Sequence, residues 1–296
     1  MFSVWCLVLF VVTPSLWAGQ QYEIKTFFEF QTSAQNLIQN YQPEEVLVVF
    51  DLDNTLLTMS EDLGSDQWWN WQSSLMKKNI SDADKLASGL VSTEFSTLLS
   101  IQGFLFASLP MIKVENTQLE VLKGAQARGI ATIVLTSRGP DFQAATFREL
   151  YKHGFDFRST ALPYTHQDYL PREPFTVSEL KTRYGFTDEE INSFGLSSVR
   201  EILYQDGVYL TSGQHKGALL RVLLKDSGFN PKLILFVDDH KKNTDAVWEA
   251  YLNSNVEVFT YRYGFLDGVV AAFHAQSKKA VIHRWEELKP FYEYFR

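Results

Sequence analysis

The sequence predicts a protein of the α/β class, built on an open sheet of mostly parallel strands with helices on both faces. Three observations lead to this prediction. Four short runs of apolar and β-branched residues have the length and composition of strands that are buried on both faces. Segments with helical periodicity lie between them, and such alternation is typical of parallel pairing. Polar residues directly follow three of the four runs.

Each expected element can be placed along the chain. The predicted strands are 46–50, 130–135, 233–237 and 256–261, and the predicted helices are 116–128, 141–153, 217–227 and 243–251. The first three helices are followed by Gly129, Gly154 and Gly228, and glycine readily adopts the left-handed conformation that often ends a helix. The expected core is therefore a Rossmann-like parallel sheet flanked by helices.

Two stretches are too long to be simple crossovers. Residues 57–113 contain Trp68, Trp69 and Trp71 in a helix-like pattern, and we expect a mostly helical cap inserted after the first strand. Residues 156–207 contain several turn signals and a capping-box pattern that starts at Thr187, and we expect an elaborated connection. The predicted division is a signal peptide at 1–18, a core at 20–56 and 114–296, and a cap at 57–113.

The first residues resemble an export signal. Residues 1–20 contain no Asp, Glu, Lys or Arg, and the apolar run 4–12 has the length of a signal-peptide core, too short to span a bilayer. Ala18 or Gly19 would precede the cleavage point. A buried N-terminal strand and an uncleaved anchor are the alternatives. We expect an exported protein, periplasmic or secreted, with no stable membrane insertion after cleavage.

Composition excludes several classes of protein. Apolar residues make up 45% and charged residues 21% of the 296, as in ordinary globular proteins rather than disordered chains or coiled coils. The net charge is −8 without a basic cluster, which argues against nucleic-acid binding. The one cysteine, Cys6, allows neither a disulfide framework nor a cysteine zinc site.

Chemically reactive side chains follow the predicted strands. Asp51 and Asp53 come after the first strand, Thr136, Ser137 and Arg138 end the second, and Asp238 and Asp239 end the third, while Lys216 precedes a helix. The carboxyl ends of parallel strands share one edge, where ligands bind. Up to four carboxylates would meet there, and such a cluster is costly unless a cation binds or protons are taken up. Mg²⁺ is the expected partner because it prefers oxygen ligands.

The order of these motifs resembles the haloacid dehalogenase superfamily. A strand followed by D-x-D-x-T, a strand ending in Thr, a distant Lys and a strand ending in D-D occur here between residues 46 and 245. The stretch from Asp51 to Trp69 also resembles, more weakly, a bacterial subgroup of this superfamily long labelled as having unknown function.

The resemblance implies a role for each residue. Asp51 would be the nucleophile that forms an aspartyl-phosphate, and Asp53 the general acid and then base. Thr136 would donate a hydrogen bond to the phosphoryl group, and Lys216 would hold Asp51 and a phosphate oxygen. Mg²⁺ would be held by a set comprising Asp51, the main-chain carbonyl of Asp53, Asp238 and Asp239.

Asp53 separates the subclasses of the superfamily. Its pumps carry Thr at this position and its dehalogenases lack this Asp, so Asp53 favours a phosphatase or a phosphomutase. The export signal argues against an intracellular phosphomutase. We therefore expect a Mg²⁺-dependent phosphomonoester hydrolase that acts on a small phosphorylated molecule or a phosphopeptide.

Several side chains have two interpretations each. Ser137 and Arg138 would contact substrate, or Arg138 would form a surface ion pair. Trp68 and Trp69 would stack on an aromatic phosphate such as phosphotyrosine, or form the core of the cap. Asn243 would orient the acidic loop or cap a helix. His215 and His240 are expected at the surface.

Two other protein classes share some of these features. A signalling receiver domain also combines an acidic pair, a Thr and a Lys, but there the acidic pair comes first in the chain, whereas here it comes last. A secreted ligand-binding or adhesin-like protein on the same fold is the alternative, and an assay for phosphatase activity separates it from an enzyme.

Overall fold

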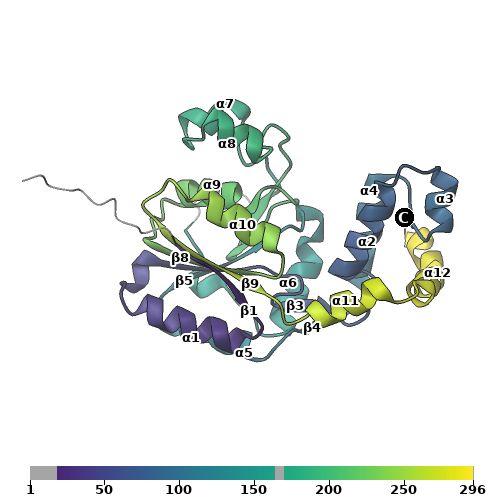
Figure 1. Ribbon diagram of the computed structural model, residues 1–296, viewed down its shortest axis with the longest axis horizontal. Helices are drawn as coiled ribbons and strands as arrows, with labels where there is room; N and C mark the ends of the chain where they lie inside the picture. The colour runs from purple at the N-terminus through teal and green to yellow at the C-terminus, as the bar shows by residue number, and fades with distance from the viewer. Residues whose placement is uncertain (1–18, 164–169, 296) are drawn as a thin grey trace, which may run out of the picture.

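The computed structural model describes residues 19–163 and 170–295, so the predicted signal segment 1–18 and Cys6 lie outside the described residues. A seven-stranded sheet has the order β1-β9-β8-β2-β5-β7-β6 and is parallel except where β6 meets β7 (Figure 1). Its strands are β1 (Gln21–Ile24), β2 (Val46–Phe50), β5 (Ala131–Thr136), β6 (Leu203–Gln205), β7 (Val208–Leu210), β8 (Leu233–Asp238) and β9 (Glu257–Tyr263).

The four predicted strands are confirmed as the four neighbouring central strands β9, β8, β2 and β5. The edge strands β1 and β6 and the strand β7 next to β6 were not predicted, because they are only three or four residues long and β1 is partly polar. A signal for the last pair was present: Asp206 and Gly207 both have positive φ, 50° and 81°, in the two-residue turn between β6 and β7. An Asp-Gly pair between apolar runs is a strong hairpin indication.

Helices cover both faces of the sheet, which confirms the predicted α/β fold class. On one face lie α1 (Phe27–Ile38), α5 (Thr117–Ala127) and α6 (Gln143–Lys152), over Val46, Val48 and Phe50 of β2. On the other lie α9 (Lys216–Ser227) and α10 (Lys241–Ala250), over Leu47 and Val49. Every residue of β2 is buried, as its uninterrupted apolar sequence predicts.

The long connection 156–207 extends the second face. It carries two short helices, α7 (Val177–Thr182) and α8 (Asp188–Ser193), whose buried residues Leu180 and Ile191 join the core beside α9. The predicted capping box is confirmed: the Glu190 amide donates to Thr187 Oγ1 at 3.1 Å, and the Thr187 amide donates to the Glu190 carboxylate at 2.9 Å. Residues 164–169 lie outside the described residues.

The interval 57–113 contains three helices between two paired strands. β3 (Leu57–Met59) and β4 (Met111–Lys113) run antiparallel, and α2 (Asp66–Met76), α3 (Asp82–Ala87) and α4 (Phe95–Ser108) lie between them in the chain. Within 19–163 and 170–295, no helix has both the length and the apolar character needed to cross a bilayer.

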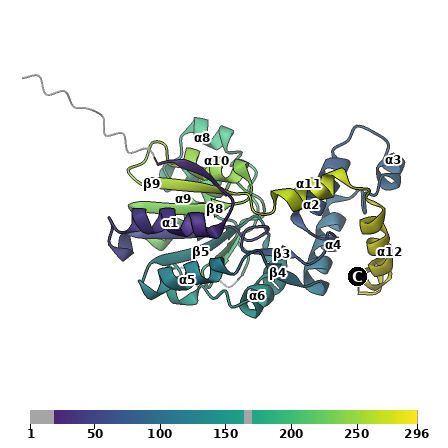
Figure 2. The same ribbon diagram turned by 60° about the horizontal axis from the view of Figure 1, so that its bottom comes forward.

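The last two helices pack with this interval rather than with the sheet. α11 (Asp267–Ala275) and α12 (Lys279–Phe295) lie beside α2 and α4 in both views (Figures 1 and 2). The rings of Trp71 and Phe273 are 6.2 Å apart, and the Tyr292 hydroxyl is 3.2 Å from Ser100 Oγ. We call α2–α4 with α11 and α12 the helical lobe. The expected core range 114–296 included these two helices, but the structure packs them on the cap interval, where Phe273, Trp285 and Tyr292 are buried.

Candidate active site

Three charged side chains meet at the carboxyl end of the central strands. Asp51 directly follows β2, Asp238 is the last residue of β8, and their strands pair in register. Lys216 Nζ lies 2.5 Å from Asp51 Oδ1 and 2.6 Å from Asp238 Oδ2. All three residues are at least 95% buried. The structure therefore brings together residues that are 165 and 22 positions apart in sequence, as the strand-end argument predicts.

Lys216 reaches this place because it begins α9. His215 caps the helix by accepting the Ala218 amide at Nδ1, 3.1 Å away. A Cβ on Gly217 would lie 2.1 Å from the Ala246 carbonyl oxygen, so only glycine lets α9 approach α10 this closely. His215 is therefore a helix cap, stacked on Phe194, rather than the surface histidine we expected.

The charges of this group are strongly coupled. Burial and the neighbouring Asp238 carboxylate raise the pKa of Asp51 to about 7, although Lys216 acts in the opposite direction. Burial also opposes the charge of Lys216, yet the two carboxylates raise the pKa of its ammonium above the usual value. Two buried carboxylates share one ammonium, and this arrangement favours a further cation.

Asp238 is fixed by the first turn of α10. The His240 amide donates to its Oδ1 at 2.8 Å, and the Asn243 side-chain amide donates to both carboxylate oxygens at 3.0 Å. Asn243 is the third residue of α10, whose N-cap is His240. Of its two interpretations, orientation of the acidic loop is therefore correct.

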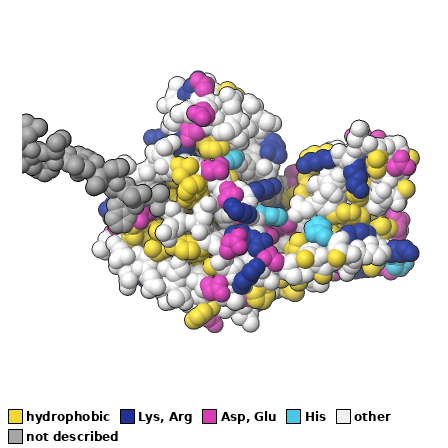
Figure 3. Space-filling model, in the orientation of Figure 1, with side chains coloured by type: hydrophobic (Ala, Val, Ile, Leu, Met, Phe, Trp, Pro, Cys, Tyr) yellow, Lys and Arg dark blue, Asp and Glu magenta, His cyan; other side chains and the backbone are white. Residues whose placement is uncertain are grey.

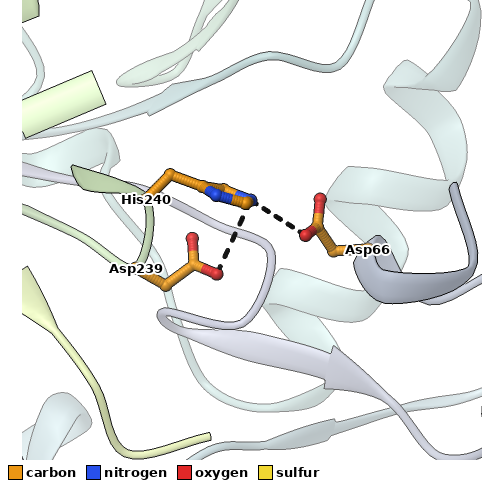
Figure 4. A group of neighbouring side chains, drawn as sticks. All are labelled: Asp66, Asp239 and His240. Carbon is orange, nitrogen blue, oxygen red and sulfur yellow. Dashed lines mark hydrogen bonds and ion pairs between the residues drawn. The ribbon is translucent and has the colours of Figure 1, made fainter. Parts of the chain in front are cut away.

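Asp239 lies beside a cluster that links the sheet to the helical lobe. Its amide donates to Thr55 Oγ1 at 3.1 Å, and its Oδ2 is 3.8 Å from His240 Nε2. His240 Nε2 also lies 2.9 Å from Asp66 Oδ2 at the first residue of α2 (Figure 4). The bond to Asp66 raises the pKa of His240 to about 10 against the effect of burial. His240 is therefore paired with Asp66, whereas we expected a surface histidine with no specific partner.

The residues present fit a divalent cation. Carboxylate oxygens of Asp51, Asp238 and Asp239 all lie within 4.8 Å of one another. Asp239 Oδ1 is buried and has no hydrogen-bond partner among the described residues. Burial raises the pKa of Asp239 well above its usual value, and nearby carboxylates add to this effect while His240 opposes it. A hard cation such as Mg²⁺ would supply what the buried oxygen lacks. The Asp53 side chain is not in this group.

Asp53 is engaged by Arg138 instead. Arg138 Nε donates to Asp53 Oδ2 at 2.8 Å, and its Nη2 donates to Oδ1 at 2.7 Å. Arg138 is 4% exposed, so its ion pair with Asp53 is buried rather than at the surface. Thr136 is buried at the end of β5, and its Oγ1 accepts the Arg138 amide at 3.1 Å. Ser137, between them, is exposed.

The two predicted substrate-binding tryptophans lie elsewhere. Trp68 is 1% exposed inside the helical lobe, and Trp69 packs on Phe95 with ring centres 6.2 Å apart. Trp68 is therefore part of the core of the lobe, and Trp69 is half-buried beside that core.

A cleft of about 310 Å³ opens beside Asp239 and His240, between the sheet edge and the helical lobe. Figure 3 shows this hollow with histidine and charged side chains near it. Its walls combine charged and apolar side chains from four segments: Asp66, Asp239, His240, Arg262, Tyr263, Leu266, Asp267, Val270, Ala271 and His274. Sequence reasoning missed Asp66, Arg262 and α11, and the only local signal was the position of Arg262 at the end of a predicted strand.

The chain was compared with known proteins. It belongs to the family described as protein of unknown function (DUF2608), whose model matches residues 25–292. No functionally curated protein matches it in sequence. A haloacid dehalogenase-like hydrolase from Streptococcus pneumoniae is similar in structure, with a TM-score of 0.37, 12% sequence identity, and coverage of 78% of this chain and 99% of that chain.

Proposed function

We propose that this member of the DUF2608 family is a Mg²⁺-dependent phosphomonoester hydrolase that works through a phosphorylated Asp51. The observation that carries the proposal is the buried group at the sheet edge. There Lys216 lies between Asp51 and Asp238, and one oxygen of Asp239 has no hydrogen-bond partner within residues 19–163 and 170–295. Carboxylates with a lysine and a divalent cation neutralise the charge of a transferred phosphoryl group.

Each residue has a defined task in the proposed reaction. An Asp51 oxygen forms a bond to phosphorus while the ester P–O bond breaks, and Asp53 gives a proton to the departing oxygen. Water then bonds to phosphorus as the Asp51–phosphorus bond breaks, with Asp53 accepting the water's proton, and inorganic phosphate leaves. Lys216 orients Asp51, and the Thr136 hydroxyl donates to the phosphoryl group.

Asp51, Asp238 and Asp239 are the side chains that would hold the metal. When bound, Mg²⁺ supplies positive charge that offsets the phosphoryl oxygens and keeps Asp51 ionised. Asn243 and the His240 amide fix the orientation of Asp238 for this purpose. Such supporting bonds commonly decide metal affinity.

The cleft beside Asp239 suits the leaving group of a compact phosphomonoester. Its volume of about 310 Å³ lies at the small end of ligand pockets. Leu266, Val270 and Ala271 give one wall an apolar surface. The expected preference for aromatic phosphates such as phosphotyrosine loses its basis, because neither Trp68 nor Trp69 lines this cleft.

The test is hydrolysis of p-nitrophenyl phosphate by the whole protein. We expect activity with Mg²⁺, loss in excess EDTA, recovery on adding Mg²⁺, and loss of at least about 1,000-fold in Asp51→Asn. Asp141→Asn, an exposed carboxylate outside the site, is the matched control and keeps full activity. Beryllium trifluoride, which mimics a phosphoryl group, should attach to Asp51. Activity that survives in excess chelator contradicts the mechanism, and ligand binding without turnover favours the ligand-binding alternative.

Export is a separate proposal that depends on the first residues alone. The uncharged segment 1–20 would direct the chain out of the cytoplasm and be removed after Ala18 or Gly19. The N-terminal sequence of the protein recovered from outside the cytoplasm tests this. An intact Met1 in the exported material would contradict cleavage.

A further inference from the structure

We propose that Arg138 is a positioning residue, which fixes the Asp53 carboxylate beside the nucleophile and is itself held by the base of the helical lobe. This inference rests on the proposed function, because it concerns the acid and base of that reaction. It assigns to Arg138 a task different from the substrate contact expected from sequence.

The contact between Arg138 and Asp53 has the geometry of a two-bond fork. Two parallel N–H groups donate to the two carboxylate oxygens at 2.8 and 2.7 Å. Such pairs fix the plane of a carboxylate as well as its position. The Asp53 side chain is 22% exposed, whereas that of Arg138 is 3% exposed. The buried guanidinium of Arg138 therefore fixes the Asp53 carboxylate, and that carboxylate stays partly accessible.

Arg138 is held in place over its whole length. Its Nη1 donates to Thr146 Oγ1 at 3.0 Å, its Nη2 to Met111 Sδ at 3.3 Å, and its guanidinium carbon lies 3.7 Å from the centre of the Phe106 ring. At the main chain, its amide donates to Thr136 Oγ1, and its carbonyl oxygen accepts the Ser212 amide at 3.0 Å. Four of the five guanidinium N–H donors thus have partners, which leaves little for a phosphate.

These contacts come from the lobe as well as from the sheet. Phe106 is near the end of α4, and Met111 begins β4, so both belong to the interval that follows β3. Thr146 belongs to α6. The orientation of Asp53 consequently depends on how α4 and β4 sit against α6, although none of these elements contributes a reacting group.

The experiment compares two substrates that differ in their need for an acid. p-Nitrophenolate leaves readily without a proton, whereas the alkoxide of glycerol 2-phosphate needs one. We expect Arg138→Met to lower kcat/KM about 100-fold for glycerol 2-phosphate and less than about 5-fold for p-nitrophenyl phosphate. Arg138→Lys keeps the charge without the fork, so it should recover only part of the lost activity.

Two further variants distinguish positioning from general stability. Arg158→Met removes an arginine that also holds a carboxylate through two N–H groups, that of Asp156, but that does not touch Asp53. This variant should change kcat/KM for the two substrates by the same factor. Adding Arg138→Met to Asp53→Asn should cause no further loss for glycerol 2-phosphate, because the two residues act as a unit.

Equal losses for the two substrates in Arg138→Met and in Arg138→Lys, or additive losses in the double variant, would overturn the proposal while leaving the proposed hydrolase intact. A wild-type protein that hydrolyses neither substrate would overturn both.

Discussion

Replacement of Asp51 by Asn should stabilise the metal-free protein while it abolishes turnover. Asp51 and Asp238 are both buried and share the ammonium of Lys216, so the folded state contains one more carboxylate than this lysine neutralises. An amide at position 51 removes that excess charge and still offers an oxygen to Lys216. A residue that destabilises its own fold is expected where a site is arranged for a ligand.

The size of the effect follows from the environment of Asp51. Burial and Asp238 raise the pKa of this carboxyl from 3.8 to about 7. Each unit corresponds to about 1.4 kcal/mol, so the folded protein disfavours the carboxylate by up to about 4 kcal/mol. Because Asn also bears part of the burial cost, we expect a gain of about 2–3 kcal/mol at pH 8. For a chain of this length that is a rise in Tm of roughly 3–5 °C.

The assay is thermal and urea unfolding in EDTA and in Mg²⁺. In EDTA, Asp51→Asn should be more stable than the wild type, whereas Asp141→Asn should match it. Mg²⁺ should raise the Tm of the wild type by mass action and that of Asp51→Asn much less. A variant that is less stable than the wild type in EDTA would refute the inferred excess of buried negative charge. An equal response to Mg²⁺ would refute the role of Asp51 as a ligand.

Three further outcomes follow from the structure. Asp239→Asn should weaken Mg²⁺ binding at least about tenfold in a calorimetric titration, and unchanged binding would exclude this buried oxygen as a ligand. Burial lowers the pKa of His215 from 6.5 to about 4, so stability is complete above pH 6.5 and falls as the pH decreases towards 4, by at most about 3 kcal/mol. Urea unfolding at about pH 7.5 and 4.5 should show a smaller loss in His215→Asn, which keeps a capping side chain, and an equal loss in both proteins would contradict this. Val270 is in the cleft wall, and Val270→Asp should raise the KM for butyl phosphate about ten times more than the KM for methyl phosphate. Val269 is exposed and outside the cleft, so Val269→Asp should change the two KM values by the same factor.

The central sheet could be predicted because its strands are buried on both faces. An uninterrupted apolar run such as VLVVF has no other stable place, and the helices between such runs impose parallel order. The edge strand β1, with sequence QYEI, lacks this signal because only one of its four residues is buried. Parallel order then placed Asp51, Asp238 and Thr136 at one edge, and α9 supplied Lys216.

The pairing of Arg138 with Asp53 could not be predicted in the same way. Both residues follow predicted strands, but the direction of a long arginine side chain depends on what surrounds it. Here Phe106 and Met111 surround it, and they come from an interval whose internal packing has no local signature. The sequence therefore indicated which residues meet at the edge, but not which of them bind each other.

The segment that packs on the tryptophan-rich helix α2 could not be predicted from the sequence either. The three tryptophans of α2 are too apolar to remain exposed, and a stack on a substrate ring was one way to cover Trp68 and Trp69. The actual cover comes from the far end of the chain, where Phe273 of α11 packs on Trp71. Val270 of the same helix lines the cleft, and so does Leu266, the residue just before the helix. In the proposed reaction α11 would therefore select the leaving group, because this helix both completes the lobe's core and lines the cleft beside Asp239.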